Sequence, residues 1–483
     1  MKTENHKRMN FKAGRLAAVL LCLALLAGCI ARSAVAPATA ETPAPAAEAA
    51  VSTPEPTSAP TQAPTPEPTP TSEPTPTPTP TPVPTAEPVS AIVREPSVMN
   101  GTEVFPWLLP GEDGSVMRVR WTGPKCDEKA YVVYAEDDGS GTLPSDARRV
   151  EAERADAAAS DKSYFKCFYE ARLDVLPDTR YLYGIAVGDG APAAVYPFVT
   201  TRGDGTLHAV FCSDTHIENK RHASYLDATL ETALNTALED GHGLDGLFFL
   251  GDMVNRIDES LDVVTVGAPL MRSVPSAVVL GNHDNLGAIT SFFPAPHRDP
   301  VTWDYWLVRE GILFIGINIR SNDYPGHIAV LREAAQLEHD RTVILIHYSL
   351  RTNGNHGIDR PNYNMWYFVG PVMEELDVDL VISGHDHEYD RAPLMNYSEV
   401  ETEAVGPVLT KRPGQMLFVC VPSATGVKFY NRNIKTEYAM AAEGMEKNRG
   451  FVLADFSPEE FRFRSVNADT DEVVDEFVLR WEQ

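Results

Sequence analysis

The sequence predicts an α/β fold of two packed sheets flanked by helices, preceded by a separate all-β sandwich. Three observations carry this prediction. From residue 207 onward, apolar strand-like runs alternate with helical stretches, which is the pattern of βαβ units. Between residues 92 and 201, short strands alternate with turn residues, as in a β-sandwich. Short polar motifs end five of the apolar runs, and the carboxyl ends of strands are where ligands collect in open α/β folds.

Residues 1–29 are typical of an export signal. A basic start precedes the apolar run 16–26, which is shorter than the span of about 20 residues that crosses a membrane and suits a signal-peptide core. The run ends in Leu26-Ala27-Gly28-Cys29, which resembles the lipobox of bacterial lipoproteins. The resemblance implies a lipidated Cys29 and an extracytoplasmic protein anchored to the bacterial cell membrane. The alternative is an ordinary signal peptide with an incidental cysteine.

Residues 30–90 have a composition that cannot bury a core. They consist mainly of Ala, Pro, Thr and Glu with repeated Thr-Pro dipeptides, which predicts a disordered, partly polyproline-II linker.

Residues 91–202 form the predicted all-β domain. Alternating runs occur at Val116–Trp121, Ala130–Tyr134, Tyr164–Arg172 and Tyr181–Val187. The segment Leu176–Tyr183 resembles the tyrosine corner of a fibronectin type III domain, in which a tyrosine hydroxyl bonds back to the backbone at a sheet corner. Because no ionisable cluster with catalytic spacing occurs here, we expect a scaffold that can form one wall of an active-site cleft.

Residues 203–483 carry the strand–helix alternation. Ser224 is expected to cap the first helix and Gly241 to end it, and two later helices are expected at Ile328–His339 and Tyr367–Leu376. The expected strands are Leu207–Asp214, Gly246–Gly251, Ser276–Gly281, Leu313–Ile319, Thr342–His347, Asp379–Ser383, Met416–Val421, Gly450–Phe456, Glu460–Ala468 and Val473–Arg480.

Charge and cysteine content exclude some function classes. The net charge of −27 repels polyanions, so no nucleic-acid partner is expected. Cys126 and Cys167 both lie in the all-β domain, and either a disulfide or two thiols fits an extracytoplasmic address. Cys212 and Cys420 lie inside apolar runs and are expected to be small buried hydrophobic residues.

Five polar motifs follow the strands of the second domain. They are Asp214-Thr215-His216, Gly251-Asp252, Gly281-Asn282-His283-Asp284, His347 and Gly384-His385-Asp386-His387. In an extended segment, residues i and i+2 face the same way, so Asp214 with His216, and His385 with His387, can each turn two ligands toward one ion. Any one motif also suits an ordinary polar strand end. Five of them in order predict two metal ions that share one carboxylate, and therefore metal-assisted hydrolysis.

This set resembles the calcineurin-like metallophosphoesterase superfamily, whose pattern is DxH, GDx, GNH(D/E), a lone His and GHxH, from roughly Leu207 to the C-terminus. The fibronectin-like domain and the stretch Gly384–Arg391 resemble the purple acid phosphatase branch. The resemblance implies a four-layer double β-sandwich flanked by helices. It also assigns Asp214, His216, Asp252 and His387 to a first metal and Asp252, Asn282, His347 and His385 to a second, and it places His283 near the leaving group as acid or charge stabiliser. The adjacent Asp284 is expected to orient or bias His283.

Two positions depart from the purple enzymes. Asn255 stands where they carry a metal-binding Tyr, and Asp284 stands where they usually carry Glu. Loss of the phenolate removes the ligand that favours ferric iron, so the expected pair is Mn, Fe(II) or Zn.

The loop Arg351–Trp366 follows the lone His and holds arginine and aromatic residues, which suit phosphate, base or sugar contacts. The alternative is a loop packed on itself. The predicted substrate contacts are Asn255, Arg351, His356, Arg360, Tyr389 and Arg391.

The predicted reaction is hydrolysis of a small phosphate ester, with a monoester favoured, by attack of a metal-bound hydroxide on phosphorus. One alternative is a phosphodiesterase acting on nucleotides or on wall or lipid phosphodiesters. An alternative from a different class is a lipid-tethered surface binding module. The oligomeric state is left open.

Overall fold

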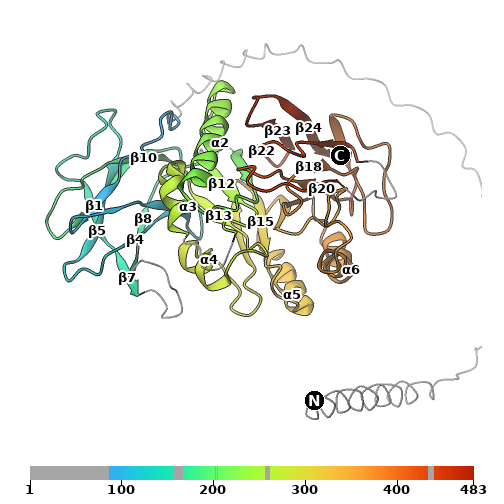
Figure 1. The fold of residues 1–483 in the computed structure, drawn as a ribbon, viewed down its shortest axis with the longest axis horizontal. Coiled ribbons are helices and arrows are strands. Elements are labelled where there is room, and N and C mark those ends of the chain that lie inside the picture. Colours follow the sequence, from blue (N-terminus) through green and yellow to red (C-terminus); the bar gives the residue numbers. More distant parts are fainter. Residues whose placement is uncertain are drawn as a thin grey trace, which may run out of the picture. The chain divides into compact units, whose positions relative to one another are not determined.

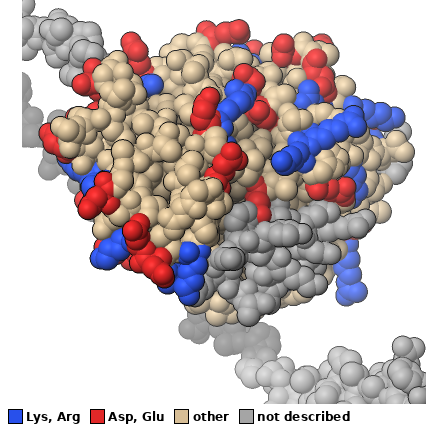
Figure 2. Space-filling model, turned by 60° about the vertical axis from the view of Figure 1, so that its left-hand side comes forward, with Lys and Arg blue, Asp and Glu red and all other residues tan. Residues whose placement is uncertain are grey.

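The computed structural model describes residues 86–156, 167–201, 203, 205–255, 261–432 and 440–482. The chain divides into two units, and all of the described residues belong to the second, Thr81–Gln483. The predicted signal peptide, Cys29 and the linker up to residue 85 lie outside the described residues. In the described part of the chain, no helix is both long and apolar enough to cross a membrane. Figure 2 shows acidic and basic side chains interspersed over the face in view.

The N-terminal part of the second unit is a pair of four-stranded antiparallel sheets (Figure 1). One sheet has the order β10-β9-β5-β6 and the other β3-β4-β8-β7, with a β1-β2 hairpin beside them. Their bounds are β1 Ser97–Met99, β2 Thr102–Val104, β3 Trp107–Pro110, β4 Val116–Gly123, β5 Ala130–Glu136, β6 Arg148–Glu151, β7 Glu153–Asp156, β8 Cys167–Asp174, β9 Arg180–Val187 and β10 Tyr196–Val199. The predicted strands correspond to β4, β5, β8 and β9.

The described residues contain four cysteines, Cys126, Cys167, Cys212 and Cys420, and all are buried thiols that form no disulfide with one another. The sequence left a disulfide between Cys126 and Cys167 open, and the structure has the two as thiols. Cys212 and Cys420 lie in the core, as predicted.

Tyr181 makes the contact of a tyrosine corner. Its hydroxyl accepts a hydrogen bond from the backbone N of Leu176 at 2.9 Å. We expect Tyr181→Phe to lower the free energy of unfolding by about 1 kcal/mol, because the Leu176 N–H loses its partner. Urea denaturation measures this. The control is Tyr131→Phe in β5, whose hydroxyl bonds to nothing in the described residues, and equal losses in the two variants would contradict the assignment.

Two seven-stranded sheets pack face to face in the rest of the unit (Figure 1). The first has the order β13-β12-β11-β22-β23-β24-β19 and the second β14-β15-β16-β17-β20-β18-β21. Phe248 and Phe456 of the first sheet meet Phe314 of the second in the core between the sheets, and Phe211 stacks on Phe248. The bounds are β11 Leu207–Cys212, β12 Gly246–Phe249, β13 Ser276–Val278, β14 Tyr305–Arg309, β15 Ile312–Ile317, β16 Arg341–Ile346, β17 Leu380–Ser383, β18 Tyr389–Arg391, β19 Val408–Lys411, β20 Leu417–Cys420, β21 Ala442–Gly444, β22 Gly450–Phe456, β23 Glu460–Asn467 and β24 Val473–Trp481.

Helices cover the outer faces of both sheets, which completes four layers. The helices α2 (Lys220–Glu239), α3 (Asp262–Gly267), η1 (Pro269–Arg272) and α4 (Leu286–Phe292) lie by the first sheet, and α5 (Tyr324–Ala334) and α6 (Arg360–Glu375) lie on the second. The predicted fold class, a double β-sandwich flanked by helices behind an all-β part, is confirmed.

Three predicted helix starts were wrong. Helix α5 begins at Tyr324 and ends at Ala334, ahead of the predicted Ile328 and His339. Helix α2 begins at Lys220, ahead of Ser224, because the Asn219 side chain caps it by accepting from the backbone N of Arg221 and His222. Helix α6 begins at Arg360, so the second half of the predicted loop is helical. Pro361 favours this start, because its fixed φ and missing N–H suit a first helical turn.

Two arginines of the N-terminal sandwich, the buried Arg118 and the partly buried Arg120, bind the end of helix α4. Arg120 Nε donates to the backbone O of Ser291 at 2.9 Å, and Arg118 Nη1 donates to the backbone O of Pro294 at 2.7 Å. Glu170 pairs with Arg118 at 2.8 Å and with Arg120 at 2.7 Å. The arginines therefore satisfy carbonyls at the end of α4 that have no partner within the helix.

Aromatic packing strengthens the same junction. Trp107 Nε1 donates to the backbone O of Phe292 at 3.0 Å, and the two rings stack with centroids 5.7 Å apart. The Phe292 ring also meets Phe168 edge-on at 5.0 Å. Since α4 follows the Gly281–Asp284 motif directly, the sandwich fixes the helix that continues from this motif.

Candidate metal centre

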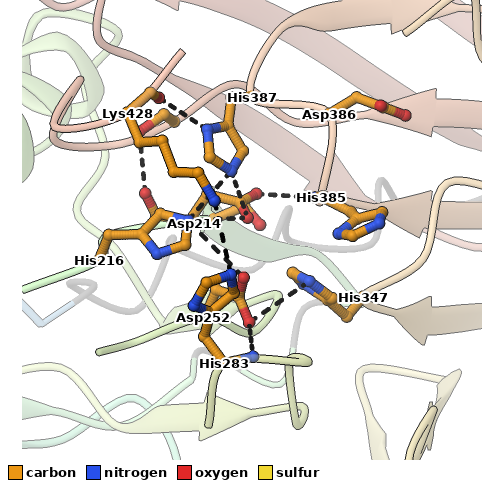
Figure 3. A network of polar contacts seen from close by, with 12 residues as sticks. Asp214, His216, Asp252, His283, His347, His385, Asp386, His387 and Lys428 are labelled. Atoms are coloured by element: carbon orange, nitrogen blue, oxygen red, sulfur yellow. Dashed lines mark hydrogen bonds and ion pairs between the residues drawn. The ribbon is translucent and has the colours of Figure 1, made fainter. Parts of the chain in front are cut away.

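The five motifs meet at one edge of the two sheets, because their strands run parallel and end there. Figure 3 shows the side chains of Asp214, Asp252, His347, His385 and His387 converging. Two buried groups of side chains each have ligand atoms within 4.8 Å of one another. The first group is Asp214, His216 and His387, and the second is Asp252, His347 and His385. The structure thus brings together all of the predicted Asp and His ligands.

The backbone at these residues is turned, not extended. Asp214, His216, Asp252, His385 and His387 have φ of 50°, 43°, 51°, 76° and 61°. The extended geometry predicted for the paired motifs is therefore wrong, although the pairs still reach one centre. Non-glycine residues adopt positive φ at a cost and persist there only when the surroundings enforce it.

Neighbouring glycines permit this close approach. A Cβ on Gly281 would overlap the backbone N and carboxylate of Asp252, and a Cβ on Gly384 would overlap the Ser213 hydroxyl. These two glycines are therefore needed for the ligands to converge.

The Nε2 atom of His347 faces two side-chain oxygen atoms. Its Nδ1 lies 2.7 Å from the backbone O of Leu250, which can only accept, so Nδ1 carries the hydrogen and Nε2 is the coordinating nitrogen. Nε2 lies 3.0 Å from Asn282 Oδ1 and 3.5 Å from Asp252 Oδ1. Burial lowers the pKa of His347, but the Asp252 carboxylate outweighs this and raises it to about 9. The position favours a cation, which fits a metal ion bound by all three side chains.

The second group shows the same pattern. His387 Nδ1 donates to the backbone O of Lys428 at 2.6 Å, and His387 Nε2 lies 3.1 Å from His216 Nε2 and 3.2 Å from Asp214 Oδ1. Burial lowers the pKa of His216 to about 3, so this imidazole is neutral near pH 7. His216 Nδ1 and Asp214 Oδ1 are buried and have no hydrogen-bond partner among the described residues. Converging lone pairs of this kind fit a second metal ion, with Asp252 Oδ2 3.6 Å from His216 Nε2 on the shared side.

His283 and Asp284 occupy different places. His283 Nδ1 donates to the backbone O of Asn255 at 2.8 Å, so its Nε2 is the atom available at the centre. Asp284 is buried and accepts from the backbone N of Gly281 at 2.9 Å and of Val254 at 3.3 Å. Burial, and then the Asp252 carboxylate, raise the pKa of Asp284 to about 7. Asp284 therefore holds the motif's backbone and does not contact His283 through its side chain.

Two predicted substrate contacts lie near the centre. The ring of His356 packs on that of His385 with centroids 4.3 Å apart, and the backbone N of His356 donates to Asp386 Oδ1 at 2.8 Å. Asn255 holds His283 through its backbone O, while its side-chain amide donates to Glu218.

The structure gives the other four different surroundings. Tyr389 Oη and Arg391 Nε each donate to Asp475 Oδ2 at 2.7 Å, and both side chains are buried. Tyr389 and Arg391 therefore hold β18 against β24, and the substrate contacts predicted for them are corrected. The guanidinium of Arg351 lies 4.1 Å above the Trp366 ring, and Arg360 is exposed at the first turn of α6.

Lys428 and Tyr430 were missed by the sequence analysis. Lys428 Nζ lies 3.5 Å from His283 Nε2 (Figure 3). It also lies 4.8 Å from the Tyr430 ring. The Tyr430 ring lies 4.5 Å from His387 and 4.7 Å from His356. The segment that carries both follows β20 and is placed by a bridge between Ser213 and Ser423, a distant pairing that leaves no local signal in the sequence.

Comparison with known proteins supports this geometry. Residues 207–389 match the model of the family described as Calcineurin-like phosphoesterase, and all five motifs lie within the match. The chain therefore contains a calcineurin-like phosphoesterase domain, and the prediction of a phosphoric ester hydrolase is confirmed. The buried Asp and His clusters fit the binuclear metal centre of that family.

Solved structures share the fold. Purple acid phosphatase PPD1 from yellow lupin (Lupinus luteus) has 15% sequence identity and a TM-score of 0.65, with 80% of this chain and 75% of that chain covered. The structure of PhoD has 11% identity and a TM-score of 0.51, with 77% of this chain and 87% of that chain covered. A search among curated proteins found no match.

Proposed function

We propose that this protein is an extracytoplasmic, lipid-anchored phosphomonoesterase with two divalent metal ions, Mn, Fe or Zn. Asp214, His216, Asp252 and His387 would hold one ion, and Asp252, Asn282, His347 and His385 the other. The observation that carries the proposal is the pair of histidines, His347 and His387, whose Nδ1 atoms donate to backbone carbonyls while their Nε2 atoms face other acceptors. The anchor is supported by the lipobox-like Leu26–Cys29 alone.

The bound ions would supply Lewis-acid activation of the attacking water and neutralise charge on the phosphate. The chain supplies the proton for the leaving group. Because His283 Nδ1 donates to the Asn255 carbonyl, its Nε2 faces the Lys428 ammonium, which can only donate. Nε2 would therefore pass a proton received from Lys428 or from solvent to the departing oxygen. Asp284 positions this motif through Gly281 and Val254.

Lys428 supports a monoester substrate. A phosphate monoester carries a charge of about −1.5 to −2 near pH 7, whereas a diester has a single ionisable oxygen. The ammonium of Lys428 lies beside His283 Nε2 at 3.5 Å, so a cation of the chain stands next to the proposed metal centre, where it would attract the second charge of a monoester. The aromatic rings of Tyr430 and His356 next to the centre favour a second candidate, hydrolysis of nucleotide phosphodiesters.

The test is the ratio of kcat/KM on a nitrophenyl phosphate monoester to that on its diester, measured after reconstitution with Mn²⁺. A ratio well above one supports the phosphomonoesterase. A ratio well below one favours the diesterase, and a protein that holds two ions but hydrolyses neither ester would contradict both.

Lys428→Met should lower kcat/KM on the monoester roughly tenfold to hundredfold, the value of a hydrogen bond to a charged group. The diester should be affected much less, because it lacks the second charge. Lys428→Arg, which keeps the cation, is the matched control. An equal loss of kcat/KM on both esters would show that Lys428 does not interact with the additional charge of the monoester.

A further inference from the structure

We propose that His208, His242 and Asp455 form a third metal site, remote from the catalytic centre, that binds Zn²⁺. His208 is the second residue of β11, and Asp455 is its cross-strand partner in β22. His242 lies in the turn that follows α2. The catalytic Asp214 follows the other end of β11, so the two sites lie at opposite ends of this strand.

Two histidine nitrogens approach one carboxylate oxygen. His208 Nδ1 lies 2.7 Å and His242 Nε2 lies 3.7 Å from Asp455 Oδ1. The three ligand atoms all lie within 4.8 Å of one another. The two imidazole rings stack with centroids 3.8 Å apart and an angle of 12° between their planes. An ordinary His–Asp ion pair requires only one of these histidines.

The tautomer of His242 gives the decisive argument. Its Nδ1 lies 3.0 Å from the backbone O of Gly243, which can only accept, so Nδ1 carries the hydrogen. In a neutral ring the lone pair is then on Nε2, and it faces the Asp455 carboxylate. Two acceptors that face each other need either a proton or a metal cation between them. A proton would serve His242 alone, whereas a metal ion can take the lone pairs of both stacked rings, which lie 3.8 Å apart, together with the carboxylate.

The same pattern marks the catalytic centre. There, His347 Nδ1 donates to the backbone O of Leu250 and its Nε2 faces Asp252. A divalent ion between His208, His242 and Asp455 would satisfy both nitrogens and the carboxylate at once.

Ligand type and surroundings favour zinc. Two imidazoles and one carboxylate form a three-ligand zinc set that leaves one coordination position open. The three residues are half-buried, so an ion can enter. Nearby arginines are already paired, Arg464 with Asp240 and Arg462 with Glu460. The ion would tie the turn after α2 to β11 and β22.

The experiment measures zinc bound by the full-length chain after dialysis against micromolar ZnCl₂, by inductively coupled plasma mass spectrometry. We expect three zinc ions per chain in the wild type and two in His242→Ala and in Asp455→Asn. Hydrolytic activity after Mn²⁺ reconstitution should be unchanged in both variants. The zinc-dependent rise in Tm that comes from this site should be lost.

A matched control is His339→Ala. His339 is also half-buried with Nδ1 held by a carbonyl, that of Leu337, but its Nε2 meets the Thr342 hydroxyl and no carboxylate. This variant should keep the wild-type zinc content. Equal zinc content in the wild type, His242→Ala and Asp455→Asn would overturn the proposal. The measurement is repeated in the Asp252→Asn background, so that the result does not depend on the catalytic centre. The Asp252→Asn protein should still bind one zinc ion at the third site, and adding His242→Ala should remove it.

Discussion

Replacing Asp252 by Asn should remove bound metal from the catalytic centre and lower kcat/KM on a phosphate ester by about 10³-fold or more. The two carboxylate oxygens face different halves of the centre. Oδ1 lies 3.5 Å from His347 Nε2, and Oδ2 lies 3.6 Å from His216 Nε2. Asparagine has one side-chain oxygen and no negative charge. One half of the metal centre would therefore lose its ligand from residue 252, and the other half would keep an oxygen ligand that carries no charge.

The fold should survive this change. The Asn side-chain oxygen can still accept the hydrogen bond that Asp252 Oδ1 now takes from the backbone N of His283 at 2.8 Å. Metal content, kcat/KM and Tm are the three measurements. The control is Asp284→Asn, a neighbouring buried carboxyl whose pKa is raised to about 7 by burial and by Asp252. It should keep both ions. An Asp252→Asn protein with two ions and near-normal activity would refute a bridging role.

His283→Ala should keep both metal ions and lose roughly 10² to 10⁴ in kcat, the usual contribution of a general acid. The reason is its position. His283 is tied to the Asn255 carbonyl by Nδ1 and stands 3.5 Å from Lys428 by Nε2, without belonging to either set of ligands proposed above.

The leaving group provides the internal control for this variant. Nitrophenolate leaves without much help from a proton donor, whereas an alkyl alcohol needs one. The loss should therefore be larger on an alkyl phosphate than on the nitrophenyl ester. Loss of metal from His283→Ala, or an equal loss of kcat on both esters, would assign the residue to another role.

The sequence located the candidate site well because its determinants are local. Each motif directly follows an apolar strand, and parallel strands bring their carboxyl ends to one edge, so the pattern of residues was enough to place Asp214, Asp252 and His347 together. The backbone conformation could not be predicted, because the positive φ of these residues is enforced by contacts between motifs such as that of Gly281 with Asp252.

The positions of residues that depend on contacts distant in sequence could not be predicted. Lys428 reaches the centre only because its segment lies beside Ser213, and nothing in residues 421–432 signals this. Conversely, Tyr389 and Arg391 follow the most specific motif yet turn to Asp475 in β24. Adjacency in sequence predicted a substrate role that the alternation of side chains along β18 does not support.

Because the N-terminal sandwich binds the end of helix α4, the sandwich and the hydrolase part are expected to depend on each other for stability. A hydrolase that began at residue 203 would lose the donors to the carbonyls of Ser291, Phe292 and Pro294, and it would expose the face on which Trp107 stacks. The N-terminal sandwich, which the sequence analysis predicted to be a separate scaffold, is therefore expected to be required for the fold of the hydrolase part. Any transplant of this enzyme, by recombination in nature or by engineering, would have to carry the sandwich with it or rebuild that surface.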